Sequence, residues 1–257
     1  MSLSTLKICG LNKLLEEGIT LAEFYKKNGA PDEFVKLVAQ SNKRYGTNIE
    51  KLAASLLNCI KKGSKKNETG WDLEYKCGNK TIFIEIKGSR YWQGIKDFKW
   101  QHILADHEWS HIILAALDFQ ELKLYMLTKD SFMELMEKGI VTQQGGAGGQ
   151  GCWFERNKAI EYLHPIDGNT IEEYRKNLNI LMEKYPCSRT PKTKEQIDKA
   201  LQKGKLAIEV KKDAKKAAAK KVKADKLLAK KAEQIRKKKA KEAEKLRKKE
   251  EIEKYAV

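Results

Sequence analysis

Two runs of strand-forming residues define the central segment of the chain. From Asp72 to Cys77 polar and apolar residues alternate, and the run from Lys80 to Lys87 is rich in β-branched residues. Both patterns are typical of strands. Gly78-Asn79 lies between the runs and suits a tight two-residue turn, so the sequence predicts an antiparallel hairpin.

This turn sets the register of the hairpin. It places Cys77 opposite Lys80 and Asp72 opposite Glu85. Because side chains alternate between the two faces of a strand, Asp72, Glu85 and Lys87 then share one face. A slip of one residue would destroy this arrangement. The residues expected to point the other way, into a core, are Ile82, Ile84 and Ile86.

Further elements are expected on both sides of the hairpin. The run 110–116 has the pattern of a buried strand, and 121–127 follows as its partner. Thr20 and Glu23 form a capping box for an N-terminal helix. That helix and the next one could read DNA as a helix-turn-helix, but we expect them to pack against the core. The other predicted elements are a short helix and loop in 1–19, helices at 31–46, 47–60, 96–105, 130–139 and 171–185, and a closing strand segment at 152–166.

Charge divides the chain near residue 190. Residues 191–257 hold 25 of the 52 Lys and Arg and 11 of the 35 Asp and Glu, so they carry 25 − 11 = +14 of the formal +17. Their Lys, Ala and Glu favour a helix, but the apolar positions keep no heptad. The tail could be a solvated helix or a sequence-independent clamp on DNA or RNA. The expected domains are a body, 1–190, made of a helical pair (1–46), a core (47–130) and a closing segment (131–190), and a basic helical tail, 191–257.

Cysteine usage and hydropathy indicate the compartment. The five cysteines are scattered without a C-x-x-C pair, which argues against a disulfide framework or a cysteine zinc site. No secretory leader is recognisable, and the longest uncharged apolar run, Ile112 to Leu117, is too short to span a bilayer. We expect a soluble intracellular protein of a reducing compartment, the cytoplasm, with no membrane partner.

The shared face of the hairpin carries candidate chemistry. The carboxylates of Asp72 and Glu85 suit a hard cation such as Mg²⁺. Such an ion can hold a phosphate oxygen and acidify a water, and the ammonium of Lys87 can position that water or stabilise developing charge. These groups could hydrolyse a phosphodiester. The alternative is a surface hairpin with ordinary cross-strand charge pairs.

The arrangement resembles the PD-(D/E)XK nuclease superfamily over roughly residues 47 to 130. Asp72 corresponds to the acidic residue of that motif and Glu85-Ile86-Lys87 to its Glu-x-Lys, whereas Trp71 stands where the family name has proline. The resemblance implies an α/β, restriction-endonuclease-like fold with a mixed sheet flanked by helices. It also implies Mg²⁺-dependent hydrolysis of double-stranded DNA by a type II restriction-like endonuclease. By the same resemblance, Glu50 could add a carboxylate to the metal cluster, and Gln101 could lie near the scissile phosphate.

Basic residues near the hairpin are candidates for binding the nucleic-acid backbone. Lys65 and Lys66 belong to a basic loop, KKGSKK, next to the proposed site. Arg90, Lys96 and Lys99 are interleaved with aromatic residues, a combination that suits phosphate binding and base stacking. Solvated loop lysines and core aromatics are the alternative interpretation.

Two other motifs are not expected to act. His107-Glu-Trp-Ser-His111 fits the zinc-protease pattern, but a strand pattern begins at Ser110, so both histidines cannot lie on one helix. The stretch 146–151 fits G-x-G-x-x-G but follows a helix and precedes a strand, the wrong order for a dinucleotide site. No G-K-[ST] is present either, so no nucleotide cofactor is expected.

The function predicted from these observations is metal-dependent DNA cleavage. The main rival is a non-enzymatic nucleic-acid-binding protein that acts through its basic tail, and a repair, junction-resolving or RNA nuclease also remains open. Cutting both strands calls for a homodimer or for two encounters, and the sequence has no dedicated dimerisation motif.

Overall fold

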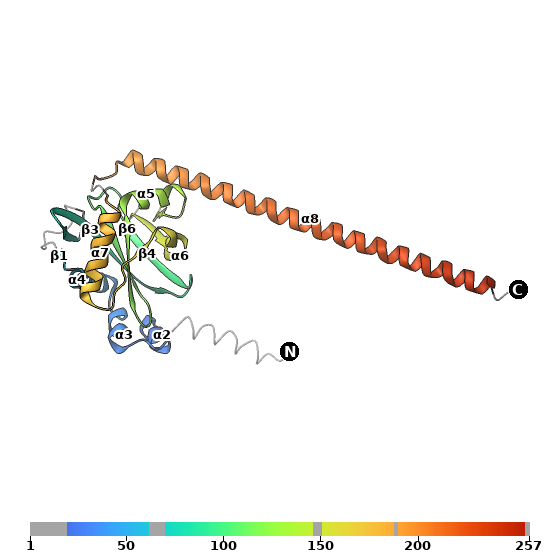
Figure 1. Ribbon diagram of the computed structural model, residues 1–257, viewed down its shortest axis with the longest axis horizontal. Helices are drawn as coiled ribbons and strands as arrows, with labels where there is room; N and C mark the ends of the chain where they lie inside the picture. Colours follow the sequence, from blue (N-terminus) through green and yellow to red (C-terminus); the bar gives the residue numbers. More distant parts are fainter. Residues whose placement is uncertain (1–19, 62–69, 146–150, 188–189, 255–257) are drawn as a thin grey trace. The chain divides into compact units, whose positions relative to one another are not determined.

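The computed structural model describes residues 20–61, 70–145, 151–187 and 190–254, which form an α/β body and a long C-terminal helix (Figure 1). The body contains a mixed sheet with helices on both faces, which confirms the predicted α/β class. Within the described residues the sheet has nine strands in the order β7-β8-β4-β3-β5-β6-β9, with β2 paired to β3 and β1 to β2. β3 and β5 are parallel, and the other pairs are antiparallel. The strands are β1 (Ile60–Lys61), β2 (Leu73–Cys77), β3 (Lys80–Trp92), β4 (Asp97–Ile103), β5 (His111–Leu117), β6 (Leu122–Thr128), β7 (Thr142–Gln143), β8 (Cys152–Glu155) and β9 (His164–Pro165).

One face of the sheet packs against four helices. Ile84 and Ile86 of β3 are buried in this core, and Ile82 is partly buried against it, as the hairpin pattern predicts. Tyr25 and Leu178 belong to the same core and anchor helices far apart in the sequence. The helices are α2 (Leu21–Lys27), α3 (Asp32–Val38), α4 (Asn42–Leu57) and α7 (Ile171–Lys184).

The opposite face carries a second core. Trp100 and Trp109 are fully buried there, together with Phe132 of α5 and Ala200 of α8. Gly204 allows α8 to pass close to this part of the body, because an added Cβ would collide with the carbonyl oxygen of Met136. The elements on this side are α5 (Lys129–Glu137), α6 (Arg156–Ala159), the 3₁₀ turn η2 (Ile160–Tyr162) and the first turns of α8 (Lys194–Lys254).

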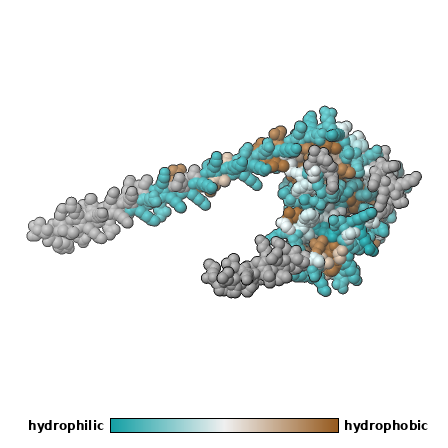
Figure 2. Space-filling model, turned by 180° about the vertical axis from the view of Figure 1, so that it is seen from behind, coloured by the Kyte–Doolittle hydropathy of each residue, from teal (hydrophilic) through white to brown (hydrophobic). Residues whose placement is uncertain are grey.

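The chain divides into two units, one up to Lys205 and one from Leu206. The helix α8 runs through this boundary, so its first turns belong to the body, whereas the predicted tail began at residue 191. In the second unit the described side chains are almost all exposed and mostly hydrophilic (Figure 2).

The N-terminal helices differ from the prediction. The capping box of Thr20 and Glu23 is confirmed, but the helix expected over 31–46 ends at Val38, and α4 begins after a cap by Ser41. Thr47 therefore lies inside a helix, and the helix start expected at residue 47 is wrong. The buried stripe of α4, with a residue at every fourth position, explains why the helix continues through Gly46. The stripe consists of Tyr45, Ile49, Ala53 and Leu57.

The helix predicted over residues 96–105 is wrong, because this segment forms strand β4. Phe98 and Trp100 point into the second core. The polar Lys99 and Gln101 alternate with them in the sequence and are only partly buried. This is the alternation of a half-buried strand, and aromatic residues favour strands over helices. Lys96 has a positive φ of 52° and belongs to the tight turn that leads into β4.

The second hairpin, β5–β6, and the helices α5 and α7 are confirmed to within two residues. The predicted closing segment consists of β8, α6, η2 and β9. The short helix expected before residue 20 and the glycine-rich loop around residues 146–150 lie outside the described residues.

Candidate active site

The predicted hairpin register is confirmed. Cys77 pairs with Lys80 and Leu73 with Ile84. The backbone N–H of Asp72 donates to the carbonyl oxygen of Ile84 at 2.9 Å, although Ile84 already pairs with Leu73, so the ladder shifts by one residue at Asp72. The predicted pairing of Asp72 with Glu85 lies beyond the last paired residues of β2, but the charge of Glu85 still acts on the Asp72 carboxyl group.

The site lies at a gap along one edge of β3. On this edge β2 pairs with β3 only as far as Ile84, and β4 pairs with it only at Tyr91 and Trp92. Between these points the edge of β3 has no strand partner in the described part of the chain. The carboxylate of Asp72 fills part of the gap, because its Oδ2 accepts a hydrogen bond from the backbone N–H of Ile86 at 2.8 Å.

Glu85 and Lys87 form an ion pair within this gap. Lys87 Nζ lies 2.5 Å from Glu85 Oε1, and the side chain of Glu85 is only 9% exposed. Burial alone would lower the pKa of Lys87, but the charge of Glu85, its hydrogen bond and the nearby Asp72 raise it overall. The lysine is therefore protonated at neutral pH, which suits orientation and charge stabilisation better than proton abstraction.

The pKa of the Asp72 carboxyl group is far from its ordinary value. Burial and the negative charge of Glu85 raise the pKa of its carboxyl group to about 7, although the hydrogen bond from Ile86 and the charge of Lys87 oppose this shift. Two carboxylates thus share a poorly solvated space with one ammonium group. A cation between them would relieve their repulsion, and carboxyl groups with shifted pKa values are common at functional sites.

Glu50 reaches the same site from α4. Its charge raises the pKa values of both Asp72 and Lys87. The approach of the helix to β3 depends on Gly88, where an added Cβ would lie 3.1 Å from side-chain atoms of both Ile49 and Tyr45. Glu50 is in the middle of α4, and its role as a further carboxylate at the site stays a prediction.

A cleft of about 680 Å³ adjoins the gap. Most of the residues that line it belong to α4, β3 and β4, three elements that are separate in the sequence. Asp72 and Glu85 are not among the described residues that line it, but Lys87, the ion-pair partner of Glu85, is. The predicted site residues that line the cleft are Glu50, Lys87, Arg90, Lys99 and Gln101.

Gln101 occupies the cleft from a strand rather than from the expected helix. The neighbouring His102 has a positive φ of 57°, and the pairing of β4 with β8 shifts register between Trp100 and Ile103. Such irregularities bend a strand and redirect its side chains. Gln101 is half-buried in the cleft wall, and its role near the scissile phosphate stays a prediction.

The predicted basic residues differ in what they contact. The guanidinium of Arg90 donates to the carbonyl oxygen of Val38 at 2.8 Å and to Asn42 Oδ1 at 2.6 Å, and it stacks on Tyr45. These contacts attach α3 and α4 to β3, a structural task. Lys96 is exposed on its turn, and Lys65 and Lys66 lie outside the described residues.

Lys99 lies between two aromatic rings. Its Nζ is 3.7 Å from the ring centroid of Trp153 and 5.3 Å from that of Trp92. Trp153 and Tyr45 were not predicted from the sequence as neighbours of the site. No local signal could have identified them, because only the pairing of β4 with β8 and the packing of α4 bring them there.

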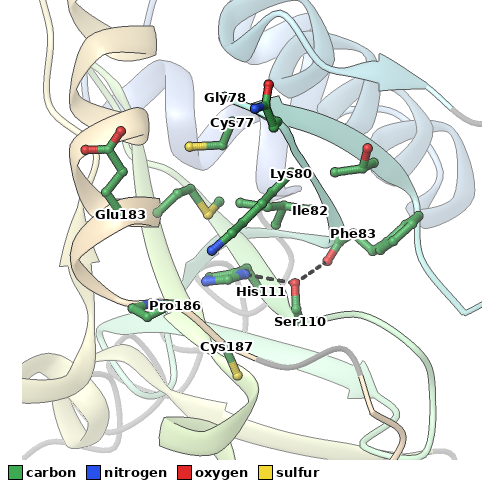
Figure 3. A pocket seen from close by; sticks show the side chains of 13 residues that line it. Cys77, Gly78, Lys80, Ile82, Phe83, Ser110, His111, Glu183, Pro186 and Cys187 are labelled. Carbon is green, nitrogen blue, oxygen red and sulfur yellow. Dashed lines mark hydrogen bonds between the residues drawn. The ribbon is translucent and has the colours of Figure 1, made fainter.

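As expected, the HExxH motif at 107–111 does not lie on a helix. His107 lies in a loop, and His111 is the first residue of β5. Figure 3 shows His111 pointing into a separate cavity of about 640 Å³ beside the hairpin turn. Its Nδ1 is 2.9 Å from Ser110 Oγ and its Nε2 is 2.9 Å from the carbonyl oxygen of Tyr185, so both ring nitrogens have partners within the protein.

The donor set at the gap fits Mg²⁺. No three His, Cys, Asp or Glu side chains in the described ranges gather closely enough to surround an ion. Mg²⁺ does not need such a cage, because it commonly binds one or two carboxylates together with waters and substrate phosphates. Asp72 and Glu85 could supply these two carboxylates, and the charge of Glu50 raises the pKa of Asp72.

Comparison with known proteins adds no relative. No family model matches the sequence, and no curated protein matches it either. The geometry of the site is therefore the main support for any function. Across the described residues, no helix is long and apolar enough to cross a membrane.

Proposed function

We propose that the protein is a Mg²⁺-dependent endonuclease that hydrolyses phosphodiester bonds of double-stranded DNA. The observation that carries this proposal is the meeting of Asp72, Glu85 and Lys87 at the unpaired edge of β3, beside a cleft. The resemblance to the PD-(D/E)XK superfamily rests on the same residues and favours a type II restriction-like activity.

Each side chain has a defined task in this proposal. Asp72 and Glu85 hold the metal, and Glu50 adds negative charge from α4. When bound, Mg²⁺ supplies Lewis acidity and lowers the pKa of a water. Lys87, which stays protonated, orients the attacking water and stabilises the negative charge that develops on the phosphate.

The cleft would hold the DNA backbone at this site. Lys99 supplies a positive charge between two aromatic rings, and Gln101 supplies a neutral hydrogen-bonding group on the cleft wall. Arg90 acts indirectly in this proposal, because its bonds to α3 and α4 keep the cleft wall in place.

The test is cleavage of mixed plasmid and phage DNA by the purified protein, with Mg²⁺ and with EDTA. Lys87→Ala is the decisive variant, and Lys76→Ala, at an exposed position of β2, is the matched control. We expect Mg²⁺-dependent cleavage by the wild type and the control, and its loss in a folded Lys87→Ala protein. Full activity of Lys87→Ala would contradict the assignment.

The products distinguish the kinds of nuclease. Discrete bands would indicate a sequence-specific endonuclease, whereas a smear would indicate a non-specific or repair enzyme. A preference for flaps or junctions over linear duplex would favour a junction-resolving nuclease.

The second candidate is a non-enzymatic nucleic-acid-binding protein. The observation that favours it is the long helix α8, which makes up most of residues 191–257, a stretch with a formal charge of +14. Absence of cleavage with any divalent metal, together with salt-sensitive retardation of DNA, would support this function over the first.

A further inference from the structure

The positive charge of the second unit of the chain is unevenly distributed along its sequence. Between residues 211 and 237 there are 12 Lys and Arg and 3 Asp and Glu, so this stretch has a net charge of 12 − 3 = +9. Residues 242–257 hold five of each kind and are neutral. Lys238, Lys239 and Lys241 lie between these two ranges, so the positive charge is concentrated between residues 211 and 241.

The helix arranges these charges on one side. At about 100° per residue, nine of the 12 basic residues fall within an arc of about 160°. We call this arc the basic face. It consists of Lys212, Lys215, Lys216, Lys220, Lys223, Lys226, Lys230, Lys231 and Lys237.

The other side of the same stretch is rich in alanine. Ala214, Ala217, Ala218, Ala229 and Ala232 fall there, together with Leu228, and all of them are exposed. Figure 2 shows teal side chains along the described part of this helix, with isolated brown positions between them. Three basic residues also lie on this side, which provides an internal control: Lys211, Lys221 and Arg236.

Few of the charges on the basic face are neutralised within the protein. Among the described side chains of this stretch, Lys216 lies 3.9 Å from Asp213 and Lys237 lies 2.7 Å from Glu233. Exposed pairs of this kind contribute at most about 1 kcal/mol, so they compete weakly with another anion. The rest of the basic face is available to an external polyanion.

We propose that the basic face of α8 is a docking surface for the phosphate backbone of double-stranded DNA. A stretch of 27 residues is about 40 Å long, so its net charge corresponds to roughly one positive charge every 4 to 5 Å. The phosphates of one DNA strand follow each other every ~3.4 Å along the duplex axis. The two charge densities are of the same order, and neutralising many phosphates releases counterions, which drives the association.

Shape favours DNA over other polyanions. The diameter of an α-helix with its side chains, about 10–12 Å, matches the width of the DNA major groove, about 12 Å. A basic arc of this width contacts phosphates on both walls of the groove. The major groove of double-stranded RNA is too narrow for this arrangement. An anionic membrane surface would need bulky apolar or aromatic residues opposite the charges, where this helix has mainly alanine.

The docking surface binds without reading sequence. Lysine is a flexible point charge and alanine has no hydrogen-bonding group, so base edges are not discriminated. The surface holds DNA independently of whether Asp72, Glu85 and Lys87 cleave it. An experiment can therefore contradict DNA binding by the basic face without contradicting the proposed nuclease activity, and the reverse also holds.

The test compares two triple variants of the full-length chain with equal loss of charge. Lys212→Gln, Lys223→Gln and Lys230→Gln together remove the centre of the basic face, whereas Lys211→Gln, Lys221→Gln and Arg236→Gln remove charge from the opposite side. Glutamine preserves helix propensity, and circular dichroism checks that both variants stay helical. Binding to a random-sequence duplex is measured in EDTA, at several salt concentrations, so that cleavage does not interfere.

We expect the basic-face variant to bind DNA at least about 10-fold more weakly, and its log–log salt slope to fall by about 2 to 3, close to 0.9 per lost contact. The control variant should lose less than about 3-fold in affinity. Equal losses in both variants, or none in either, would overturn the oriented docking surface. Equal affinity for duplex RNA would overturn the choice of DNA, and tighter binding to phosphatidylserine vesicles than to DNA would overturn nucleic acid as the partner.

Discussion

The Asp72 carboxylate accepts a hydrogen bond from the backbone N–H of Ile86 at 2.8 Å, across the unpaired edge of β3. A strand edge normally satisfies this N–H with a neighbouring strand. Here a carboxylate takes that place and is thereby held beside Glu85 and Lys87. The same hydrogen bond closes the sheet edge and positions the candidate metal ligand.

This arrangement predicts that Asp72→Asn stabilises the metal-free protein at alkaline pH. The pKa of Asp72 is raised from its ordinary value of 3.8 to about 7 in the folded state, so between these pH values the folded protein holds a proton that the unfolded chain releases. Stability contributed by this group therefore falls as pH rises from about 4 to 7 and stays low above pH 7. Asparagine can still accept the hydrogen bond from Ile86 and carries no charge.

Thermal unfolding in EDTA checks this prediction. At pH 8 we expect the Tm of Asp72→Asn to exceed that of the wild type by at least about 2 °C, a shift that corresponds to roughly 1 kcal/mol for a chain of this size. The gain should shrink toward pH 4. Asp167→Asn, at an exposed position, is the control and should show no such pH dependence. A Tm gain for Asp72→Asn that does not change with pH would contradict the shifted titration.

Magnesium should reverse this order of stability. Millimolar Mg²⁺ is expected to raise the Tm of the wild type at pH 8 by a few degrees, because an ion that binds only the folded state stabilises it. Asp72→Asn and Glu85→Gln should lose this response, and Asp167→Asn should keep it. A Mg²⁺ response that survives in both site variants would place the ion elsewhere in the protein.

Much of this site could be predicted from local sequence. The Gly78-Asn79 turn and the strand alternation determine the register of the hairpin, and the structure has that register from Cys77 and Lys80 to Leu73 and Ile84. Such a prediction works because a two-residue turn and a period of two leave few alternatives. The chemistry of the three residues remains a proposal.

The parts that depend on distant packing were not predictable. Gln101 was expected on a helix, but Phe98 and Trp100 are buried in the second core, and that burial decides in favour of a strand. The helix expected from residue 47 starts earlier, at Asn42, because its apolar stripe, which includes Tyr45, packs in the core. Arg90 looks like a phosphate ligand in sequence, yet its partners lie some 50 residues away.

Glu50 is expected to tune the titration of Asp72. Its charge raises the pKa of Asp72, so Glu50→Gln should lower that pKa and move the acid limb of the cleavage rate profile toward lower pH. If Glu50 also helps to hold the metal, the rate at pH 8 falls by roughly 10-fold in the same variant. Glu33→Gln, at an exposed position of α3, serves as the control. An unchanged acid limb would show that Glu50 does not act on Asp72.

Gly70 should be necessary for the position of Asp72. It has a positive φ of 73°, and a Cβ added there would lie 2.7 Å from His107 Cβ and 2.9 Å from the backbone nitrogen of Glu108. Alanine would therefore combine backbone strain with a collision against the loop before β5, and the chain could relieve both only by moving the segment that leads into Asp72.

We expect Gly70→Ala to destabilise the protein by about 1–3 kcal/mol and to reduce cleavage at least 10-fold at a temperature where it is still folded. Gly94→Ala is the matched control, because its added Cβ meets no atom within 4 Å and its φ is not in the left-handed region. Urea unfolding gives the change in stability, and cleavage assays give the change in rate. Wild-type stability and activity in Gly70→Ala would mean that the approach of His107 to this glycine does not position the site.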